Sequence, residues 1–228
     1  LECNLQRFYF PECKAYELDH RSADLGDRKK FWNAVGSFGR YYPLPYYTIL
    51  SENANAYQGR DCTPLLWTPG NAPQIYVNRF AGTEKRLYHL YNASGFTYEG
   101  VALAVRLGPD QHLFDLLDCT EVATIEMPGR SESYASVYLP RGGVGCLGQF
   151  TRRLEVSGDE KTLTVVASKL PGPCRLAVAD REGRVLLSQT ASAGANTLDL
   201  TKLTVPGQPA CVKLLLTGNE LLDVAALP

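Results

Sequence analysis

The amino-acid sequence predicts a mainly β protein in which two antiparallel β-sandwich units follow a short helical segment. Three observations predict this fold. Helix signals are confined to residues 1–73. From Gln74 onward, apolar and polar residues alternate with the period of two that is typical of half-buried strands. These runs are short and are separated by turns that contain Gly or Pro, a pattern that favours β-sandwiches.

The helical segment is expected to hold two short helices. Ser22 and Asp24 are N-cap candidates for the first helix, over residues 27–39, which carries glycines at its end that can terminate it. Pro45 can begin the second helix, over residues 46–59. Helical spacing places four apolar or aromatic residues on one buried face of that helix: Tyr46, Ile49, Leu50 and Tyr57. Residues 63–74 are rich in proline and indicate a connector.

The first β unit is predicted over residues 74–152. Its turns include Gly82, where we expect a positive φ, and the Gly-rich residues 140–149 indicate a turn followed by a strand. These residues lack the Lys-Ser/Thr of a phosphate-binding loop. Seven strand-like runs make up the unit: 74–80, 84–92, 97–107, 112–118, 121–127, 132–140 and 141–150.

The second β unit is predicted over residues 153–228. Gly183 marks a hairpin turn within it. Such a small unit has a thin core, so we expect it to dock on its neighbour. Five strand-like runs are evident: 162–169, 174–181, 184–190, 196–202 and 210–218.

Composition excludes two classes of partner. The net charge is −1, so the chain carries no basic field that would hold nucleic acid or an anionic membrane. No apolar run reaches the roughly 18 residues of a membrane-spanning helix. No signal peptide is visible, and a chain that begins Leu-Glu-Cys and has Met127 as its single methionine is expected to be a mature product, an expressed fragment or an excised domain.

The cysteines and histidines do not form a metal-binding pattern. The seven cysteines include no CxxC pair and indicate buried free thiols, with one or two disulfides as the alternative. The three histidines have no ligand spacing with them, so we expect neither a metal site nor a cofactor. The residues concerned are Cys3, Cys13, Cys62, Cys119, Cys146, Cys174 and Cys211, with His20, His89 and His112.

Glu12 is a weak candidate for a catalytic residue. It follows the aromatic run 8–10, as a carboxylate does at the end of a barrel strand, where barrel enzymes keep their catalytic groups. The alternative is a rim carboxylate that pairs with a neighbouring cation or is solvated. Glycoside hydrolysis needs two carboxylates, and a self-standing hydrolase would have to pair Glu12 with another, such as Asp19 or Glu52.

Several polar and aromatic side chains are candidate glycan contacts. Tyr42, Tyr46 and Trp67 could stack on sugar rings, or they could be packing residues with an exposed polar edge. Residues 51–57 carry side chains that suit sugar hydroxyls, with a solvated helix face as the alternative. Residues 92–94 fit the acceptor pattern for N-glycosylation, which is a common chance match.

Residues 74–150 resemble the β-sandwich that follows the catalytic barrel in many bacterial glycoside hydrolases and related proteins. The resemblance is carried by "YNAS" at Tyr91–Ser94, by Gly100, by "DLL" at 115–117 and by "LPRGG" at 139–143. It implies that residues 1–73 are the end of a TIM barrel and that the last unit is an accessory β-sandwich. The catalytic pair of that family sits mostly on earlier barrel strands, so no catalytic residue is carried over.

The resemblance implies a non-catalytic C-terminal region of a glycoside hydrolase-like, carbohydrate-active protein. This region would support the catalytic barrel and contact glycan, and enzymatic activity would belong to the parent protein. A barrel takes roughly 250 residues, which 228 residues of mostly strand cannot contain. The alternative is an independent carbohydrate- or protein-binding module. The expected partners are an upstream catalytic barrel, a glycan, or a second copy of the chain through an exposed N-terminal segment. The sequence does not fix the location, and a secreted or periplasmic setting would suit this function.

Overall fold

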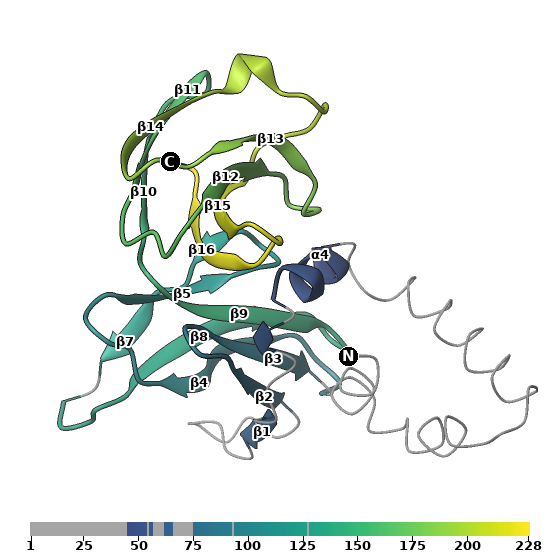
Figure 1. The fold of residues 1–228 in the computed structure, drawn as a ribbon. Coiled ribbons are helices and arrows are strands. Elements are labelled where there is room, and N and C mark those ends of the chain that lie inside the picture. Colours follow the sequence, from purple (N-terminus) through teal and green to yellow (C-terminus); the bar gives the residue numbers. More distant parts are fainter. Residues whose placement is uncertain (1–44, 54, 57–61, 66–74, 93, 127) are drawn as a thin grey trace, which may run out of the picture.

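The predicted mainly β fold is confirmed. The computed structural model describes residues 45–53, 55–56, 62–65, 75–92, 94–126 and 128–228, and the first predicted helix lies outside them. Within the described residues, antiparallel strands form four sheets, and helix α4 (Pro45–Glu52) lies beside them (Figure 1). This helix begins at Pro45 as expected and ends earlier than the predicted residue 59.

The first unit is a sandwich of a six-stranded sheet and a three-stranded sheet. The larger sheet has the order β1-β2-β3-β9-β5-β6, and the smaller has the order β4-β8-β7. Val77, Leu103 and Leu147 belong to the apolar core between them. The strands are β1 (Cys62–Leu65), β2 (Ile75–Ala81), β3 (Arg86–Asn92), β4 (Tyr98–Val105), β5 (Gln111–Asp115), β6 (Thr120–Glu121), β7 (Thr124–Glu126), β8 (Ser133–Leu139) and β9 (Val144–Thr151).

Four sequence predictions in this unit are wrong in detail. The run 121–127 does not form one strand, because β6 and β7 belong to different sheets. Strand β1 lies in the predicted connector, where Pro64 is tolerated because β1 is at the edge of its sheet. The run 112–118 leaves the sheet after Asp115, whose Oδ1 accepts hydrogen bonds from two following backbone N–H groups and so makes a turn. Gly82 does not have a positive φ. Gly82 is instead closely packed, because a Cβ there would lie 3.3 Å from the Lys85 carbonyl oxygen and 3.4 Å from the Ala56 Cα.

Strand β9 carries the Gly-rich sequence that was predicted to be a turn and a strand, and this prediction is confirmed. Gly148 is required there by packing, because a Cβ would lie 2.1 Å from the Phe150 ring. The ring therefore folds back over the glycine and fills a fully buried position on the side of the sheet that faces the second unit.

The second unit is also a two-sheet sandwich, with the orders β10-β11-β14 and β13-β12-β15-β16. Leu163, Val178 and Leu214 belong to its core. The sequence did not indicate β10, or β16 with its internal Asp223. The elements are β10 (Leu154–Gly158), β11 (Thr162–Ala167), β12 (Cys174–Ala179), β13 (Val185–Thr190), β14 (Gly194–Asp199), the 3-10 helix η2 (Leu200–Lys202), β15 (Cys211–Leu216) and β16 (Leu221–Ala226).

The two units dock through an apolar cluster of their own. Phe114 and Phe150 of the first unit share it with Ala177 and Leu215 of the second, and Ile49 of α4 completes it. Strand side chains alternate between faces, so neighbouring residues of β12 and β15 can serve the interface and the core of the second unit at once. The thin core expected for the second unit is thus extended by its contact with the first.

Candidate functional site

The structure tests few of the residues that the sequence indicated as a site. Glu12, Tyr42 and Trp67 lie outside the described residues. Tyr46 lies in helix α4, of which only the backbone is described at that position. The proposed roles of these four residues therefore stay predictions. The described side chains that form a candidate site lie between the two β units.

Two of the polar residues in 51–57, which the sequence indicated as sugar contacts or a solvated helix face, are removed from the surface, whereas Ser51 and Asn55 are exposed. Glu52 and Asn53 are buried. The Glu52 Oε2 atom accepts a hydrogen bond from Lys213 Nζ at 2.8 Å, and Asn53 Nδ2 donates to the Ile49 carbonyl at 2.8 Å. Because its carboxylate is buried in an ion pair, Glu52 cannot be the second carboxylate of an open hydrolytic site.

Glu52 belongs to a charged group, here called the junction, made of Glu52, Lys85, Lys213 and Glu220. Lys85 lies in the turn between β2 and β3, and its Nζ donates to the carbonyls of Glu52 at 3.3 Å and of Leu221 at 2.6 Å. Its Nζ also lies 3.6 Å from a Glu220 carboxylate oxygen. Burial lowers the pKa of Lys85 to about 8, although the negative charges of Glu220 and Glu52 oppose this shift. The junction thus joins helix α4, the first unit and the second unit.

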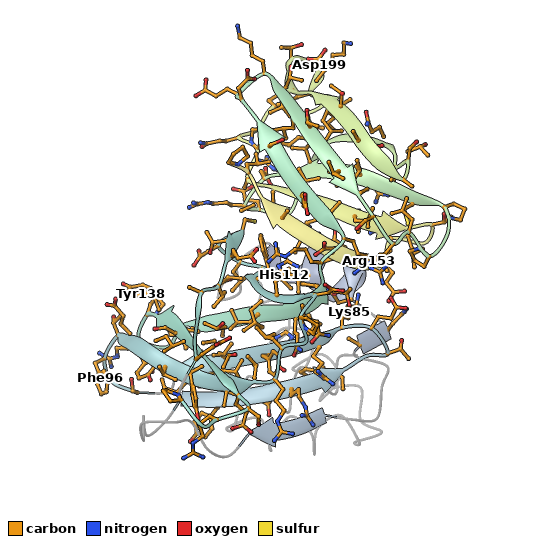
Figure 2. The ribbon with its side chains drawn as sticks, turned by 90° about the vertical axis from the view of Figure 1, so that its left-hand side faces the viewer. Lys85, Phe96, His112, Tyr138, Arg153 and Asp199 are labelled. Atoms are coloured by element: carbon orange, nitrogen blue, oxygen red, sulfur yellow. The ribbon has the colours of Figure 1, made fainter. Side chains whose placement is uncertain are left out.

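A second charged contact between the units is centred on His112. Its Nε2 lies 2.7 Å from Asp223 Oδ1, and its Nδ1 lies 3.1 Å from Glu121 Oε2. The other oxygen of Asp223 accepts hydrogen bonds from the backbone N–H groups of Arg153 at 2.6 Å and Leu154 at 2.8 Å. Figure 2 shows His112, Lys85 and Arg153 close to the boundary between the two units. Asp223 therefore fixes both the histidine and the chain segment that enters the second unit.

The protonation state of His112 follows from these contacts. Burial alone would lower its pKa, but hydrogen bonds with Asp223 and Glu121, together with their negative charges, raise the pKa of His112 to about 9. At neutral pH the ring is therefore a cation, and both of its N–H groups can donate to carboxylates. The contact is a buried, charge-assisted hydrogen bond between the units.

We expect the chain to lose stability as the pH rises from neutral to alkaline. The folded-state pKa of His112 lies above its unfolded value of 6.5, so its stabilisation is complete below pH 6.5 and is lost as the pH passes through about 9. His112 should account for a loss of about 3 kcal/mol over this range. Lys85 partly offsets this loss, because its folded-state pKa lies below its unfolded value and its contribution to stability therefore rises above about pH 8. Urea unfolding between pH 6 and pH 9.5 measures it. His112→Gln should flatten the pH profile, and an equally steep profile in that variant would contradict the assignment.

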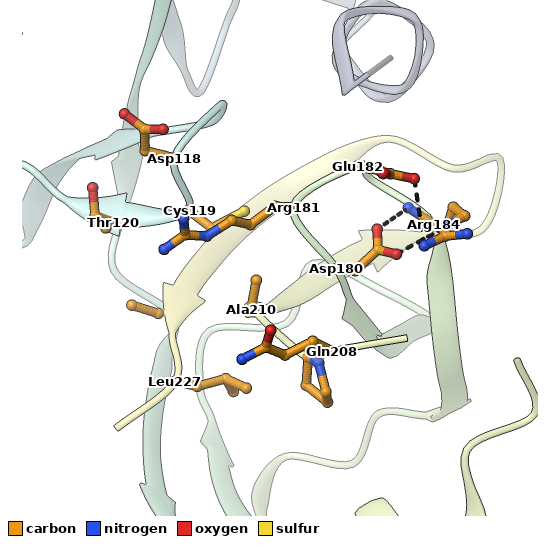
Figure 3. A pocket seen from close by; sticks show the side chains of 12 residues that line it. Asp118, Cys119, Thr120, Asp180, Arg181, Glu182, Arg184, Gln208, Ala210 and Leu227 are labelled. Carbon is orange, nitrogen blue, oxygen red and sulfur yellow. Dashed lines mark hydrogen bonds and ion pairs between the residues drawn. The ribbon is translucent and has the colours of Figure 1, made fainter. Parts of the chain in front are cut away.

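A cleft of about 580 Å³ opens between the units on the side of the turn that follows β5 (Figure 3). Asp118, Cys119 and Thr120 line it from the first unit. The turn between β12 and β13 lines it from the second, with Asp180 held by Arg184 through a 2.7 Å hydrogen bond. Figure 3 shows the Arg181 side chain reaching toward Cys119.

The cleft brings together a thiol, a guanidinium group and carboxylates. Cys119 was expected to be one of several buried free thiols, and the structure shows it as a free, buried cysteine. Cys119 lies in a polar turn, between Asp118 and Thr120, whereas other described cysteines lie in strands. This polar surrounding is the sequence signal that could have distinguished Cys119 from them.

Two aromatic rings project from one end of the first unit. Phe96 and Tyr138 are 60% and 63% exposed, and Figure 2 shows them near each other at the edge of this unit. Both flank a buried amide, because Asn92 Nδ2 donates to the carbonyls of Phe96 at 2.8 Å, Leu139 at 2.9 Å and Pro140 at 3.0 Å. We call Phe96 and Tyr138 the aromatic patch.

The same contacts show that the N-glycosylation pattern at Asn92 is a chance match. The Asn92 side chain is buried, and its Oδ1 accepts hydrogen bonds from the backbone N–H and the hydroxyl of Ser94. An acceptor asparagine has to be reachable at the surface. Asn92 instead ties the loop after β3 to the end of β8.

Within the part of the chain that the structure describes, no group of three or more His, Cys, Asp or Glu side chains could hold a metal ion. The described helices include none with the length and apolar character needed to span a membrane. A scan against protein-family models and a search of curated proteins found no match to this chain.

Proposed function

We propose that this chain is the non-catalytic β-sandwich region of a glycoside hydrolase-like, carbohydrate-active protein, and that it holds the preceding chain segment in a fixed position. The observation that carries the proposal is the buried ion pair between Glu52 of helix α4 and Lys213 of β15. This contact joins the end of the segment that resembles a barrel terminus to the second β unit.

Packing around helix α4 supports such an anchoring role. Ile49 is buried in the cluster between the two units. Thr48 lies against the turn between β12 and β13, where a Cβ at Gly183 would come within 2.9 Å of the Thr48 hydroxyl oxygen. The helix is therefore held on one side by apolar packing and at its end by the junction. A segment attached to this helix would be fixed in orientation relative to both sheets.

The buried carboxylates support a non-catalytic role. Glu52 is paired with Lys213, Asp223 with His112, and Asp180 with Arg184. Glycoside hydrolysis requires one carboxylic acid and one carboxylate that both face the glycosidic bond. These three acids face protein cations instead.

We expect Glu52→Gln to loosen helix α4 selectively. The variant keeps the shape of the side chain but removes the charge that pairs with Lys213. Exchange of the amide hydrogens of residues 49–52, which are bonded within the helix, should become roughly tenfold faster, which corresponds to about 1.4 kcal/mol of local opening. Ser51→Ala is the matched control, because Ser51 is exposed on the same helix. Equal exchange in Glu52→Gln and the natural chain would contradict anchoring by this pair.

The role in a larger protein is tested with the full coding sequence. The chain alone should not hydrolyse chromogenic glycosides. In the protein that includes the residues encoded ahead of Leu1, Glu52→Gln should lower the temperature at which glycosidase activity is lost. The proposal fails if the chain alone is hydrolytic, if no catalytic barrel is encoded upstream, or if activity is unchanged while helix α4 opens.

The aromatic patch favours a second function, that of an independent carbohydrate-binding module. Exposed single apolar residues are common, but here two large exposed rings lie at the same end of the sandwich. Sugar rings stack on the faces of such rings, and the buried Asn92 amide holds the loop that carries Phe96 against the end of β8, which carries Tyr138. The patch would therefore be preorganised for a ligand.

We expect Tyr138→Ala and Phe96→Ala each to weaken glycan binding roughly tenfold or more if the patch is a binding site, without a change in Tm. Titration calorimetry with oligosaccharides selected on a glycan array measures the effect. Tyr76→Ala is the control, because Tyr76 is an exposed tyrosine on a different sheet. A loss of binding in the control variant, or unchanged binding in both patch variants, would rule the patch out.

A further inference from the structure

We propose that Cys119 and Cys211 are a redox-active thiol pair at the base of the cleft, and that peroxide oxidises them to a disulfide that links the two β units. Cys119 is the attacking thiol and Cys211 is the resolving thiol. This modification site is separate from the aromatic patch, and Ile49 and Glu52 of helix α4 line the same inner cavity as the two thiols.

The fold brings the two thiols together from distant parts of the chain. Cys119 lies in the turn between β5 and β6 of the first unit, and Cys211 opens β15 of the second. Both belong to the apolar cluster between the units, and both line the same small inner cavity with Phe114 and Val224. Cys119 also lines the open cleft. A small oxidant that enters the cleft therefore meets Cys119 first, with Cys211 behind it.

Burial and charge give the two thiols different properties. Cys119 is 8% exposed and Cys211 is 1% exposed. Hydrogen bonding with Cys211 lowers the pKa of the Cys119 thiol, and the positive charges of Lys213 and Arg181 act in the same direction against the effect of burial. The same hydrogen bond and burial raise the pKa of Cys211. Since the thiolate is the nucleophile, Cys119 is the reactive member and Cys211 keeps its proton.

The backbone at Cys119 supports a role for its side chain. Its φ is +55°, in the left-handed region that Gly or Asn occupies at lower cost. The chain accepts this strain and places a thiol there, in contact with both the cleft and the inner cavity. Two other described cysteines, Cys146 and Cys174, lie in regular strands and line neither space.

The chemistry balances with one peroxide per pair. The Cys119 thiolate attacks one oxygen of hydrogen peroxide, so an S–O bond forms, the O–O bond breaks, and the departing hydroxide takes a proton to become water. The Cys211 sulfur then attacks the Cys119 sulfur. An S–S bond forms, the S–O bond breaks, and the hydroxyl group leaves as water with the Cys211 proton. Two thiols are oxidised by two electrons, and peroxide is reduced to two waters.

The experiment uses the full chain, first reduced and then treated with one equivalent of hydrogen peroxide. Peptide mapping without reduction should recover a linked Cys119–Cys211 peptide, and Tm should rise by roughly 10 °C because the link closes a long loop across both units. Cys119→Ser and Cys211→Ser should abolish both effects. Cys174→Ser is the matched control and should behave as the natural chain. In Cys211→Ser, peroxide should leave Cys119 as a sulfenic acid that dimedone traps.

A second measurement needs no substitution. Brief iodoacetamide treatment of the folded, reduced chain should alkylate Cys119 at least tenfold faster than Cys146, Cys174 or Cys211. The proposal is overturned if peroxide yields no Cys119–Cys211 peptide, if it links other cysteines in preference, or if Cys211 is alkylated before Cys119.

Discussion

Asp223→Ala should destabilise the chain by about 3–5 kcal/mol, the usual cost of removing one partner of a buried ion pair. The Asp223 side chain is fully buried and serves partners on both sides of the unit boundary. Its loss leaves the His112 cation without its closest carboxylate and leaves the backbone N–H groups of Arg153 and Leu154 without their acceptor. Each of these groups is costly when buried and unpaired.

Two control variants define this effect. Asp223→Asn keeps an acceptor oxygen but removes the charge, so its loss should be smaller than that of the alanine variant. Asp110→Ala removes an exposed carboxylate that also pairs with a cation, Lys169, and should cost far less, because a solvent-exposed ion pair is screened by water. Urea unfolding at pH 7 measures all three variants. If Asp223→Ala and Asp110→Ala cost the same, Asp223 does not hold the units together.

Asn92→Ala should destabilise the chain by about 3 kcal/mol, because three backbone carbonyls lose one common donor in a buried setting. The loop that carries Phe96 and the end of β8 should then separate. Thermal unfolding measures the loss of stability, and near-ultraviolet circular dichroism should report altered surroundings of the exposed aromatic rings.

Variants of similar size separate the donor role of Asn92 from simple packing. Asn92→Asp preserves the volume but places a carboxylate, which cannot donate, against the carbonyls of Phe96, Leu139 and Pro140. It should be at least as unstable as the alanine variant at neutral pH. Ser94→Ala removes one hydroxyl bond to Asn92 and should cost about 1 kcal/mol. A stable Asn92→Asp variant would contradict the donor role.

The fold class was predictable because period-two alternation is a local property of the chain. Strand β3 lies within the predicted run 84–92, and β11 lies within the predicted run 162–169. The missed strands contain residues that break the local pattern. Pro64 in β1 is accepted because that strand is at an edge, and Asp223 in β16 is accepted because its partners come from the first unit. The edge position of β1 and the partners of Asp223 depend on residues that are distant in the sequence, so a local pattern of residues cannot reveal them.

The candidate site was much less predictable. Glu52 pairs with a lysine 161 residues away, and His112 with an aspartate 111 residues away, so neither partner could be identified from spacing. The polar residues around Glu52 suggested sugar contact or solvent, whereas the fold uses Glu52 in a buried contact. Cys119 and Cys211 likewise come from different units and meet through the docking of the units. Contacts between side chains of different units therefore cannot be identified from the residue spacing in a single sequence.

The short link between the units limits how this chain can be divided or recombined. Strand β9 ends at Thr151 and β10 begins at Leu154, and the backbone N–H groups of Arg152 and Arg153 are bonded to Asp110 and Asp223. The second unit cannot be moved alone into another protein without loss of this contact. A copy of it would contain Asp223 but lack His112, the partner of that carboxylate in the first unit. We expect evolutionary shuffling or laboratory grafting to succeed only when both units move as one piece.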